Sequence, residues 1–277
     1  MTLNIKSLRL LGEGRSASVY ALDDKKALKL FYEGWSREQV KEIFDRNRAS
    51  ENAMIPVVHI YETVTVNGRS GLIMDRMDES SLDRRIERAS SIDERLDLVD
   101  RFASMAGSIH ETMIDGDDLP DQKEYARSLI GLLPGAGHSK EKIDMIRSVI
   151  EDVPQENGYI HGDLHTGNVI PDKNGDMKLT DLGSFTGKGH FLWDLCCMYS
   201  HYVFFPSIMD DDTVYKYIGM SREAGKQVYD EFIRAYFRQE VPDIVKMIRN
   251  VQAVKVYLAD ALYPGLFDAD SLRLLPF

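Results

Sequence analysis

Residues 161–168, H-G-D-L-H-T-G-N, gather side chains that can do chemistry into one short segment. The histidines at 161 and 165 have the i, i+4 spacing that would place two imidazoles on one zinc ion in a helix. The two glycines of the segment disfavour that helix, and no glutamate lies between the histidines as in H-E-x-x-H metalloproteases. A nucleophilic site is also disfavoured, because the chain has no G-x-S-x-G turn.

Phosphoryl transfer uses the remaining residues of this segment. It needs an aspartate that receives a hydroxyl proton, an asparagine a few residues later that holds Mg²⁺, and a second acidic metal ligand on a neighbouring loop. Asp163, Asn168 and the aspartate of D-L-G at 181–183 occur in that order. The residues between them, V-I-P-D-K-N-G-D-M-K-L-T, predict a short hairpin with its turn at Asn174-Gly175. Such a hairpin would bring the two loops together.

The first third of the chain has the strands and the glycine loop that a nucleotide site needs. An extended segment at 5–11 is followed by G-E-G-R-S-A-S, and A-L-K-L-F at 27–31 predicts a strand that carries a lysine. Residues 36–53 predict a helix with Val40, Ile43, Phe44 and Asn47 on one face. Residues 57–66 and 69–74, separated by Asn-Gly, predict a hairpin.

After Met77 the pattern becomes helical. S-I-D-E at 91–94 is a capping box that opens a helix, and further helices are expected at 121–133, at 139–152 and from 191 onward, with breaks at prolines 206, 242 and 264. We therefore predict an α+β fold with two lobes: a small antiparallel β-sheet lobe over 1–77 and a larger, mostly helical lobe over 78–277 that carries the catalytic loop and the acceptor site. A joint near 75–79 is a natural place for a ligand cleft.

Composition limits the classes of function. The 277 residues contain 34 lysines and arginines against 45 acids, a formal net charge of −11, which disfavours a nucleic-acid partner. No apolar run is long enough to cross a bilayer, and the first residues, M-T-L-N-I-K-S-L-R-L, show no apolar signal core followed by a small-residue cleavage site. The only cysteines, Cys196 and Cys197, are adjacent and predict buried thiols in a reducing cytoplasm. We expect a cytoplasmic protein that is a monomer or a weak dimer.

These motifs resemble the protein-kinase-like superfamily. H-G-D-L-H-x-G-N with D-x-G in place of D-F-G is similar to the aminoglycoside phosphotransferase and choline kinase branch, and the resemblance extends from Gly12 to the W-D-L around Asp194. It implies that Asp163 is the catalytic base, or orients the acceptor hydroxyl, and that Asn168 and Asp181 bind Mg²⁺. His161 would brace the loop, and Asp194 would anchor it.

The resemblance also implies a site for ATP, with GTP left open. Lys29 would contact the α and β phosphates, and Gly12, Gly14 and the backbone amides through Ser16 would cover the triphosphate. Backbone groups from Asp75 to Met77 would bind adenine, and Met74 would line the back of the base pocket. The acidic partner of Lys29 is either Asp45 or Glu42, and we favour Asp45.

Departures from the protein-kinase pattern favour a small acceptor over a protein. Gly162 stands where protein kinases have arginine, His165 stands where protein-serine kinases have lysine, and no A-P-E follows Asp181. We interpret His165 as a residue that caps the loop by hydrogen bonding, and His59 and His110 as packing or surface residues. The third glycine of the nucleotide loop is also missing.

The sequence thus predicts a phosphotransferase, dependent on ATP and Mg²⁺, that acts on a hydroxyl of a small molecule. Aminoglycosides, amino sugars, choline-like amines and homoserine-like amino acids all remain compatible as acceptors. Two alternatives stay open: a catalytically silent nucleotide-binding module, and a protein kinase.

Overall fold

The structure is a computed structural model that describes residues 5–14, 16–77, 80–239 and 241–277. The contacts of the chain define two compact units, one holding residues 1–80 and 169–184 and the other holding residues 81–168 and 185–277. The segment 169–184 therefore groups with the N-terminal residues, whereas a division after residue 77 groups it with the helices. Of the predicted joint at 75–79, residues 78 and 79 lie outside the described residues.

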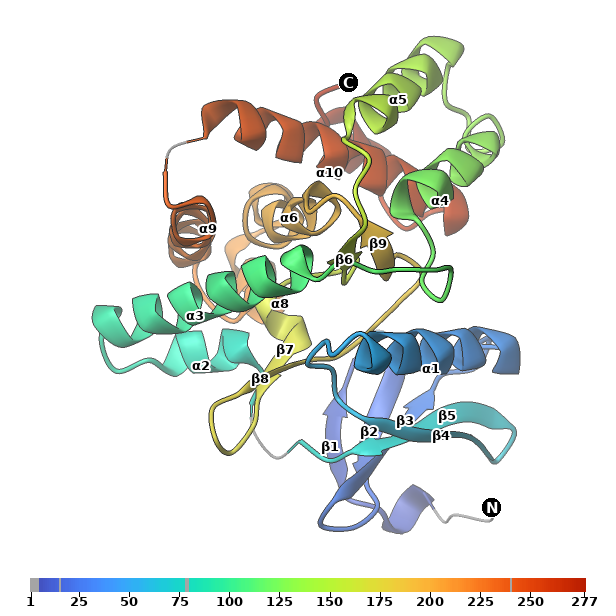
Figure 1. Ribbon diagram of the computed structural model, residues 1–277, viewed down its shortest axis with the longest axis vertical. Helices are drawn as coiled ribbons and strands as arrows, with labels where there is room; N and C mark the ends of the chain where they lie inside the picture. The colour runs from blue at the N-terminus through green and yellow to red at the C-terminus, as the bar shows by residue number, and fades with distance from the viewer. Residues whose placement is uncertain (1–4, 15, 78–79, 240) are drawn as a thin grey trace. The chain divides into compact units, whose positions relative to one another are not determined.

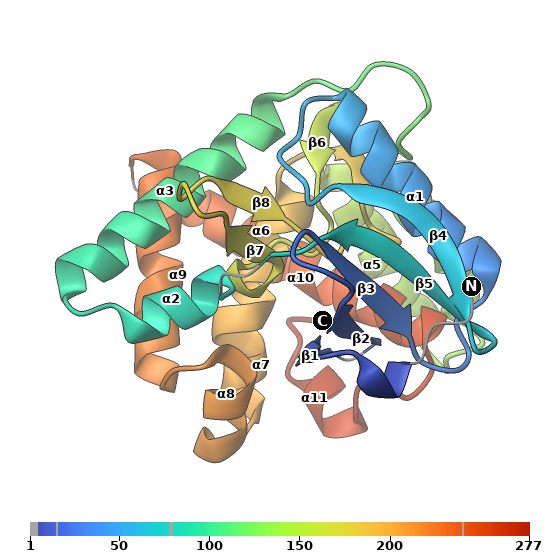
Figure 2. The ribbon, with the colours of Figure 1, turned by 90° about the horizontal axis from the view of Figure 1, so that it is seen from below.

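The first unit is built on a five-stranded antiparallel sheet in the order β1-β2-β3-β5-β4 (Figures 1 and 2). Its strands are β1 (Leu10–Glu13), β2 (Ala17–Ala21), β3 (Lys26–Phe31), β4 (Ile60–Val66) and β5 (Arg69–Asp75). Asn67 and Gly68 join β4 to β5 with φ of 51° and 81°, as the predicted hairpin turn requires. Residues 5–7, predicted as extended, form a 3-10 turn, because Ile5 packs under the sheet against the buried cluster of Leu28 and Leu30.

Helix α1 (Arg37–Asn52) packs against one face of this sheet (Figure 1). The Ser36 hydroxyl accepts a hydrogen bond from the backbone N–H of Gln39, and the Gln39 side chain accepts one from the backbone N–H of Ser36, which completes a capping box. The inward residues are those that the periodicity predicts: Val40, Ile43, Phe44 and Asn47.

Strand β3 places Lys29 on the face that α1 covers. Side chains alternate along a strand, and in β3 Ala27 and Phe31 join the buried cluster beneath α1, whereas Leu28 and Leu30 join a separate cluster on the opposite face. Lys29 lies between Ala27 and Phe31 in this alternation. Its side chain therefore emerges on the α1 side of the sheet.

A second hairpin belongs to the same unit. Strands β7 (Val169–Pro171) and β8 (Met177–Leu179) form the predicted antiparallel hairpin, and Gly175 in the predicted turn has φ of 86°. The backbone N–H of Val58 donates to Leu179 (2.8 Å), and that of Leu179 donates to Pro56 (2.7 Å). These two hydrogen bonds attach the hairpin, and the D-L-G that follows it, to the first unit.

The second unit is mostly helical. Its helices are α2 (Leu82–Arg88), α3 (Ile92–Glu111), α4 (Gln122–Leu129), α5 (Lys140–Asp152), α6 (Leu192–Tyr199), α7 (Phe205–Ile208), α8 (Asp211–Ile218), α9 (Arg222–Phe237), α10 (Pro242–Leu262) and α11 (Ala269–Arg273). A π-helical turn, Ser200–Phe204, connects α6 to α7. Pro206 and Pro242 stand in the first turns of α7 and α10, so they begin helices and do not simply interrupt them. Within the described ranges, no helix combines the length and apolar character needed to cross a membrane.

The core of the second unit forms where α3 packs against α9 and α6 packs against α10. The rings of Phe102 in α3 and Phe232 in α9 have centroids 5.1 Å apart, and both side chains are fully buried. Against this core lies a short sheet of β6 (Gly158–Ile160) and β9 (Gly187–Gly189). Residues 161–165 begin where β6 ends, so the H-G-D-L-H segment starts from a buried strand.

Candidate active site

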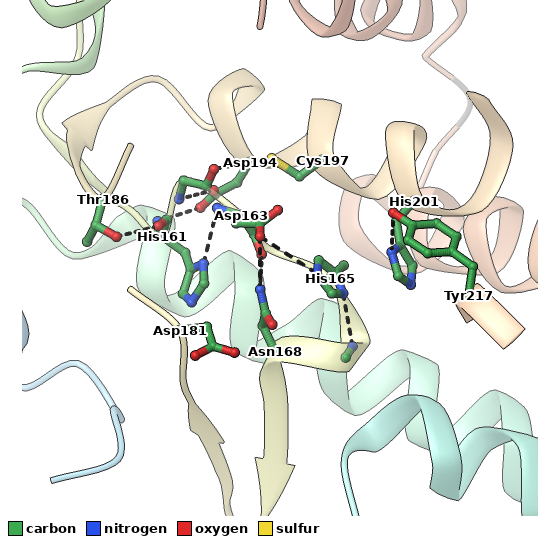
Figure 3. A network of polar contacts seen from close by, with 12 residues as sticks. His161, Asp163, His165, Asn168, Asp181, Thr186, Asp194, Cys197, His201 and Tyr217 are labelled. Carbon is green, nitrogen blue, oxygen red and sulfur yellow. Dashed lines mark hydrogen bonds and ion pairs between the residues drawn. The ribbon is translucent and has the colours of Figure 1, made fainter. Parts of the chain in front are cut away.

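The loop at 161–165 is anchored by one buried carboxylate on α6. Asp194, with no exposed surface, accepts hydrogen bonds from the backbone N–H of His161 (2.8 Å) and of Gly162 (2.6 Å) (Figure 3). Burial acts to raise the pKa of Asp194, but the hydrogen bond from His110 and the neighbouring cations lower it below its usual value. Asp194 is therefore a carboxylate, and the prediction that it anchors the loop is confirmed.

His110 is a polar support of this anchor. Its Nε2 lies 3.1 Å from the Asp194 carboxylate and its Nδ1 lies 2.8 Å from the Tyr236 hydroxyl, at the buried end of α3. The packing role expected for His110 is confirmed, since the residue is buried and its ring centroid lies 5.6 Å from that of Tyr236, and the structure adds the two polar partners. The signal available in the sequence was a single histidine on the apolar stripe of a helix, which has to find polar partners when it is buried.

Gly162 allows the close approach that the loop makes to the next segment. Its φ is +84°, and a Cβ at this position would lie 2.2 Å from the backbone carbon and oxygen of Phe185. The Thr186 hydroxyl donates to the carbonyl oxygen of His161 (2.7 Å) from the same segment. Both the backbone conformation and the packing thus require glycine here.

The structure brings Asp163 and Asn168 together. The Asn168 amide group donates to the backbone carbonyl of Asp163 (2.9 Å) and to its carboxylate (3.3 Å), and Figure 3 shows the two side chains turned toward each other. Asn168 is 7 % exposed, whereas the Asp163 side chain is 64 % exposed. The loop therefore presents one carboxylate to solvent while its other polar groups are used internally.

Both histidines of the segment serve the loop itself. His161 Nδ1 accepts from the backbone N–H of Asp163 (3.2 Å), and His165 Nδ1 accepts from the backbone N–H of Gly167 (3.1 Å). Burial lowers the pKa of His165, so its imidazole is neutral, in agreement with its role as an acceptor. Its ring stacks on that of His201, with centroids 4.0 Å apart. The predicted bracing role of His161 and capping role of His165 are confirmed.

Lys29 and Asp181 form an ion pair within the first unit. The Lys29 side chain is 14 % exposed and that of Asp181 is 46 % exposed. Burial lowers the pKa of Lys29 to about 8. Asp181 has φ of +59°, a left-handed conformation that aspartate tolerates better than most residues.

Asp45 does not pair with Lys29, and this prediction was wrong. The Asp45 carboxylate pairs with Lys41, one turn earlier on α1, and both side chains are more than half exposed. The reason is the phase of the helix: Val40, Ile43 and Phe44 turn inward, which directs position 45 to solvent. Glu42, the other candidate, is exposed as well.

Helix α1 contacts the D-L-G segment through a different residue. The guanidinium of Arg46 donates to the backbone carbonyl of Gly183. Sequence reasoning missed Arg46, although its place beside the inward stripe of the helix was the available signal. The helix therefore holds the loop that carries Asp181, and it supplies no acidic partner to Lys29.

The other predicted nucleotide residues also lie in the first unit. Gly12 is in β1, and the backbone N–H of Gly14 donates to Ala17 (2.9 Å) to close the turn into β2; the Ser16 carbonyl accepts from Tyr32 (2.9 Å). Among the described residues, a Cβ at Gly12 would meet no atom within 4 Å, so packing does not explain this glycine.

The residues predicted to contact adenine lie at or near the buried cluster between the sheet and α1. Asp75 ends β5, where its carboxylate accepts from the Tyr61 hydroxyl (2.7 Å) and its backbone N–H donates to His59 (2.9 Å). Met74 belongs to the buried cluster beneath α1, and Met77 packs against that cluster.

Residues 7–243 match the sequence profile of the APH phosphotransferase enzyme family. The chain belongs to this family. A search among curated proteins found no significant match. As a member of the phosphotransferase family, the chain carries H-G-D-L-H-T-G-N and D-L-G inside the matched region, and the match ends just after α10 begins.

Solved structures of phosphotransferases share this fold. The aminoglycoside phosphotransferase APH(2'')-IIa, in a ternary complex with streptomycin and ATP, is 18% identical with a TM-score of 0.60, covering 95% of this chain and 88% of its own. APH(3'')-Id from Streptomyces rimosus, with ADP and streptomycin, is 15% identical with a TM-score of 0.55, covering 94% of each chain. A macrolide 2'-phosphotransferase of type I is 11% identical with a TM-score of 0.53, covering 96% and 88%. The predicted α+β, kinase-like fold is confirmed.

Proposed function

We propose that this protein transfers the γ-phosphoryl group of ATP, with Mg²⁺, to a hydroxyl group of a small molecule. The observation that carries the proposal is the setting of Asp163. A solvent-exposed carboxylate stands on a loop whose backbone is fixed by buried groups, and an asparagine holds it from five residues away. Membership in a phosphotransferase family supports the reaction class.

In the proposed reaction, Asp163 orients the acceptor hydroxyl and receives its proton. The hydroxyl oxygen forms a bond to the γ-phosphorus, the bond from that phosphorus to the bridging oxygen breaks, and ADP leaves. Positioning and electrostatic stabilisation dominate in this chemistry, since the transferring group needs little covalent help from the protein. A fixed loop backbone with one exposed carboxylate is suited to that task.

The residues proposed to bind magnesium fit the ion chemically. Mg²⁺ prefers oxygen ligands and commonly takes only one or two from protein, completing its shell with phosphates and water. Asp181 offers a half-exposed carboxylate. Asn168 uses its amide nitrogen as a donor to Asp163, which leaves its amide oxygen as the ligand atom. When bound, the ion would neutralise charge on the transferring phosphate.

The nucleotide would be held by the first unit. We propose that Lys29 contacts the phosphates, that Gly12, Gly14 and Ser16 cover them, and that the backbone of Asp75 and Met77 binds the base. The open space around Gly12 and the apolar cluster with Met77 at its edge support this proposal.

We propose a small acceptor, not a protein. After the D-L-G segment the chain passes through the three-residue strand β9 and enters α6 at Leu192, so little chain is available for a peptide-docking segment. Streptomycin is named in two of the similar structures and a macrolide phosphotransferase in a third, and a polyhydroxylated natural product or amino sugar is the acceptor class to test first. Use of ATP agrees with the predicted cytoplasmic location.

The test is ADP release by the purified protein with Mg·ATP and a panel of alcohols that contains aminoglycosides, macrolides, amino sugars and choline. We expect turnover with at least one acceptor, and a loss of about 100- to 10,000-fold in Asp163→Asn. Asp117→Asn, a change at a fully exposed aspartate, is the matched control and should keep full activity. Binding of Mg·ATP without turnover by any acceptor, unchanged by Asp163→Asn, would show a silent nucleotide-binding module.

A further inference from the structure

The side chain of Lys255, which has no role in the proposed chemistry, reaches the catalytic loop with its ammonium group. Lys255 lies in α10 among buried residues that include Val254, Val256 and Leu258. Its ammonium donates to the backbone carbonyl of Gly162, to that of Trp193 (3.2 Å) and to the Cys197 sulfur (2.9 Å). An ammonium has three N–H donors, and here each of them has a partner.

The surroundings of Lys255 keep it charged. Burial alone would lower its pKa, but Cys197, Cys196 and the Asp194 carboxylate raise it above the usual value for lysine. The Lys255 ammonium also makes a cation–π contact with the Phe185 ring, at 5.0 Å from the ring centroid. A buried cation is stable only with such a complete set of partners.

The contact with Gly162 fixes the peptide group that leads into Asp163. The carbonyl oxygen of that peptide accepts from Lys255, and its N–H, which belongs to Asp163, donates to His161 Nδ1 (3.2 Å). The preceding peptide is held through the N–H of Gly162 by Asp194 (2.6 Å). Two consecutive peptide groups before the exposed carboxylate are therefore held by charged or imidazole side chains.

We propose that Lys255 is a positioning residue for phosphoryl transfer, which acts by fixing the Gly162–Asp163 peptide and thereby the direction of the Asp163 carboxylate. This inference rests on the proposed function of Asp163. Lys255 touches neither substrate nor nucleotide in this role. It joins α10 to the loop and to Trp193, the residue before Asp194, so the cation and the anion hold the loop at neighbouring points.

The principal test compares Lys255→Met with Lys246→Met. Methionine matches the length and apolar stem of lysine but has no N–H donor, and Lys246 is an exposed lysine on the same helix. In Lys255→Met we expect kcat to fall about 10- to 100-fold with the KM for ATP unchanged, because a small misplacement of a catalytic group lowers the rate without removing nucleotide contacts. Lys246→Met should match the wild type.

Hydrogen exchange supplies a readout that does not depend on activity. The amides in the peptide 158–168 should exchange about tenfold faster in Lys255→Met. Val99→Ala, which removes buried methyl groups from the N-terminal half of α3, controls for general destabilisation and should leave that peptide protected. Lys255→Arg keeps the cation and its donors, and it should recover part of the lost protection and rate; it also serves if Lys255→Met does not fold.

The two proposals fail in distinguishable ways. Absence of turnover in the wild type with every acceptor would reject the proposed function, while exchange at 158–168 would still report on the anchoring by Lys255. An active wild type together with a Lys255→Met variant that keeps kcat within about twofold and shows unchanged exchange would overturn the positioning role.

Discussion

Gly162→Ala is the substitution for which the structure makes the sharpest prediction. The residue has φ of +84°, and a methyl group there would lie 2.2 Å from the backbone carbon and oxygen of Phe185. These obstructing atoms are backbone and cannot rotate away as a side chain can. The loop or the 185–186 segment would have to move, and the hydrogen bond from Thr186 to His161 connects the two.

The expected loss of stability has two parts. The left-handed backbone conformation costs alanine roughly 1–2 kcal/mol more conformational energy than it costs glycine. Forcing a methyl group into filled space adds about 1–3 kcal/mol. The total is roughly 2–5 kcal/mol, most of the stability of a typical domain in the least favourable case. Gly137→Ala isolates the first part, because Gly137 has φ of +81° and an added Cβ would meet no described atom within 4 Å.

The measurement is urea unfolding of both variants beside the wild type, with turnover measured well below the melting temperature. Gly162→Ala should be less stable than Gly137→Ala by about 1–3 kcal/mol and should also lose activity, whereas Gly137→Ala should keep it. A difference within about 0.5 kcal/mol between the two variants, an ordinary experimental spread for surface changes, would refute the claim that the loop is locked against Phe185.

Three further predictions concern charge and ligand. Asp194→Asn should lower the free energy of unfolding by about 2–4 kcal/mol in urea titrations, because one amide cannot accept from both loop N–H groups and His110; an equally stable variant would contradict this role. Burial and nearby His110 lower the pKa of His190 to about 4, so the native state keeps it neutral while the unfolded chain binds a proton below pH of about 6.5. Stability should therefore fall as the pH decreases from about 6.5 to about 4, and His190→Gln should flatten this part of the curve, by about 3 kcal/mol; an unchanged slope would show that the pKa of His190 is not lowered in the native state. Lys29→Met should shrink the rise in melting temperature that Mg·ATP produces, which for the wild type at 100 times Kd corresponds to about 2.7 kcal/mol; an undiminished rise would exclude Lys29 from the phosphate site.

Local structure was predictable wherever neighbouring residues determine it. The Asn67-Gly68 turn needs two positive φ values, and the sequence offers the residue pair that best tolerates them. Ser36 and Ser91 cap helices at the predicted positions, each accepting a hydrogen bond from the backbone three residues later. The inward face of α1 followed from the helical period in the same way.

Contacts between distant segments were less predictable. Sequence reasoning placed Lys29 beside a carboxylate of α1, although the predicted inward face of that helix already directs Asp45 to solvent. Strand β9, Gly187–Gly189, has no strand signal because two of its three residues are glycine, and its close contact with Pro120 and Gln122 explains why a side chain at Gly187 is not tolerated. The sequence located its partner strand β6 but did not indicate that β6 pairs with β9.

Substitutions around the loop should separate effects on activity from effects on stability. The buried Asp194 carboxylate and the Lys255 ammonium bind backbone atoms of the loop, whereas the Asp163 side chain is mostly exposed and contacts only the side chains of Asn168 and His165 among the described residues. Removing an exposed carboxylate leaves no buried group unpaired, while removing the charge of Asp194 or Lys255 leaves donors or acceptors of the loop without partners. On the proposed function, Asp163→Asn should therefore lower turnover about 100- to 10,000-fold at nearly native stability, whereas Asp194→Asn and Lys255→Met should lower both activity and stability. If all three variants lost activity and stability in the same ratio, the result would contradict the roles that the hydrogen bonds indicate.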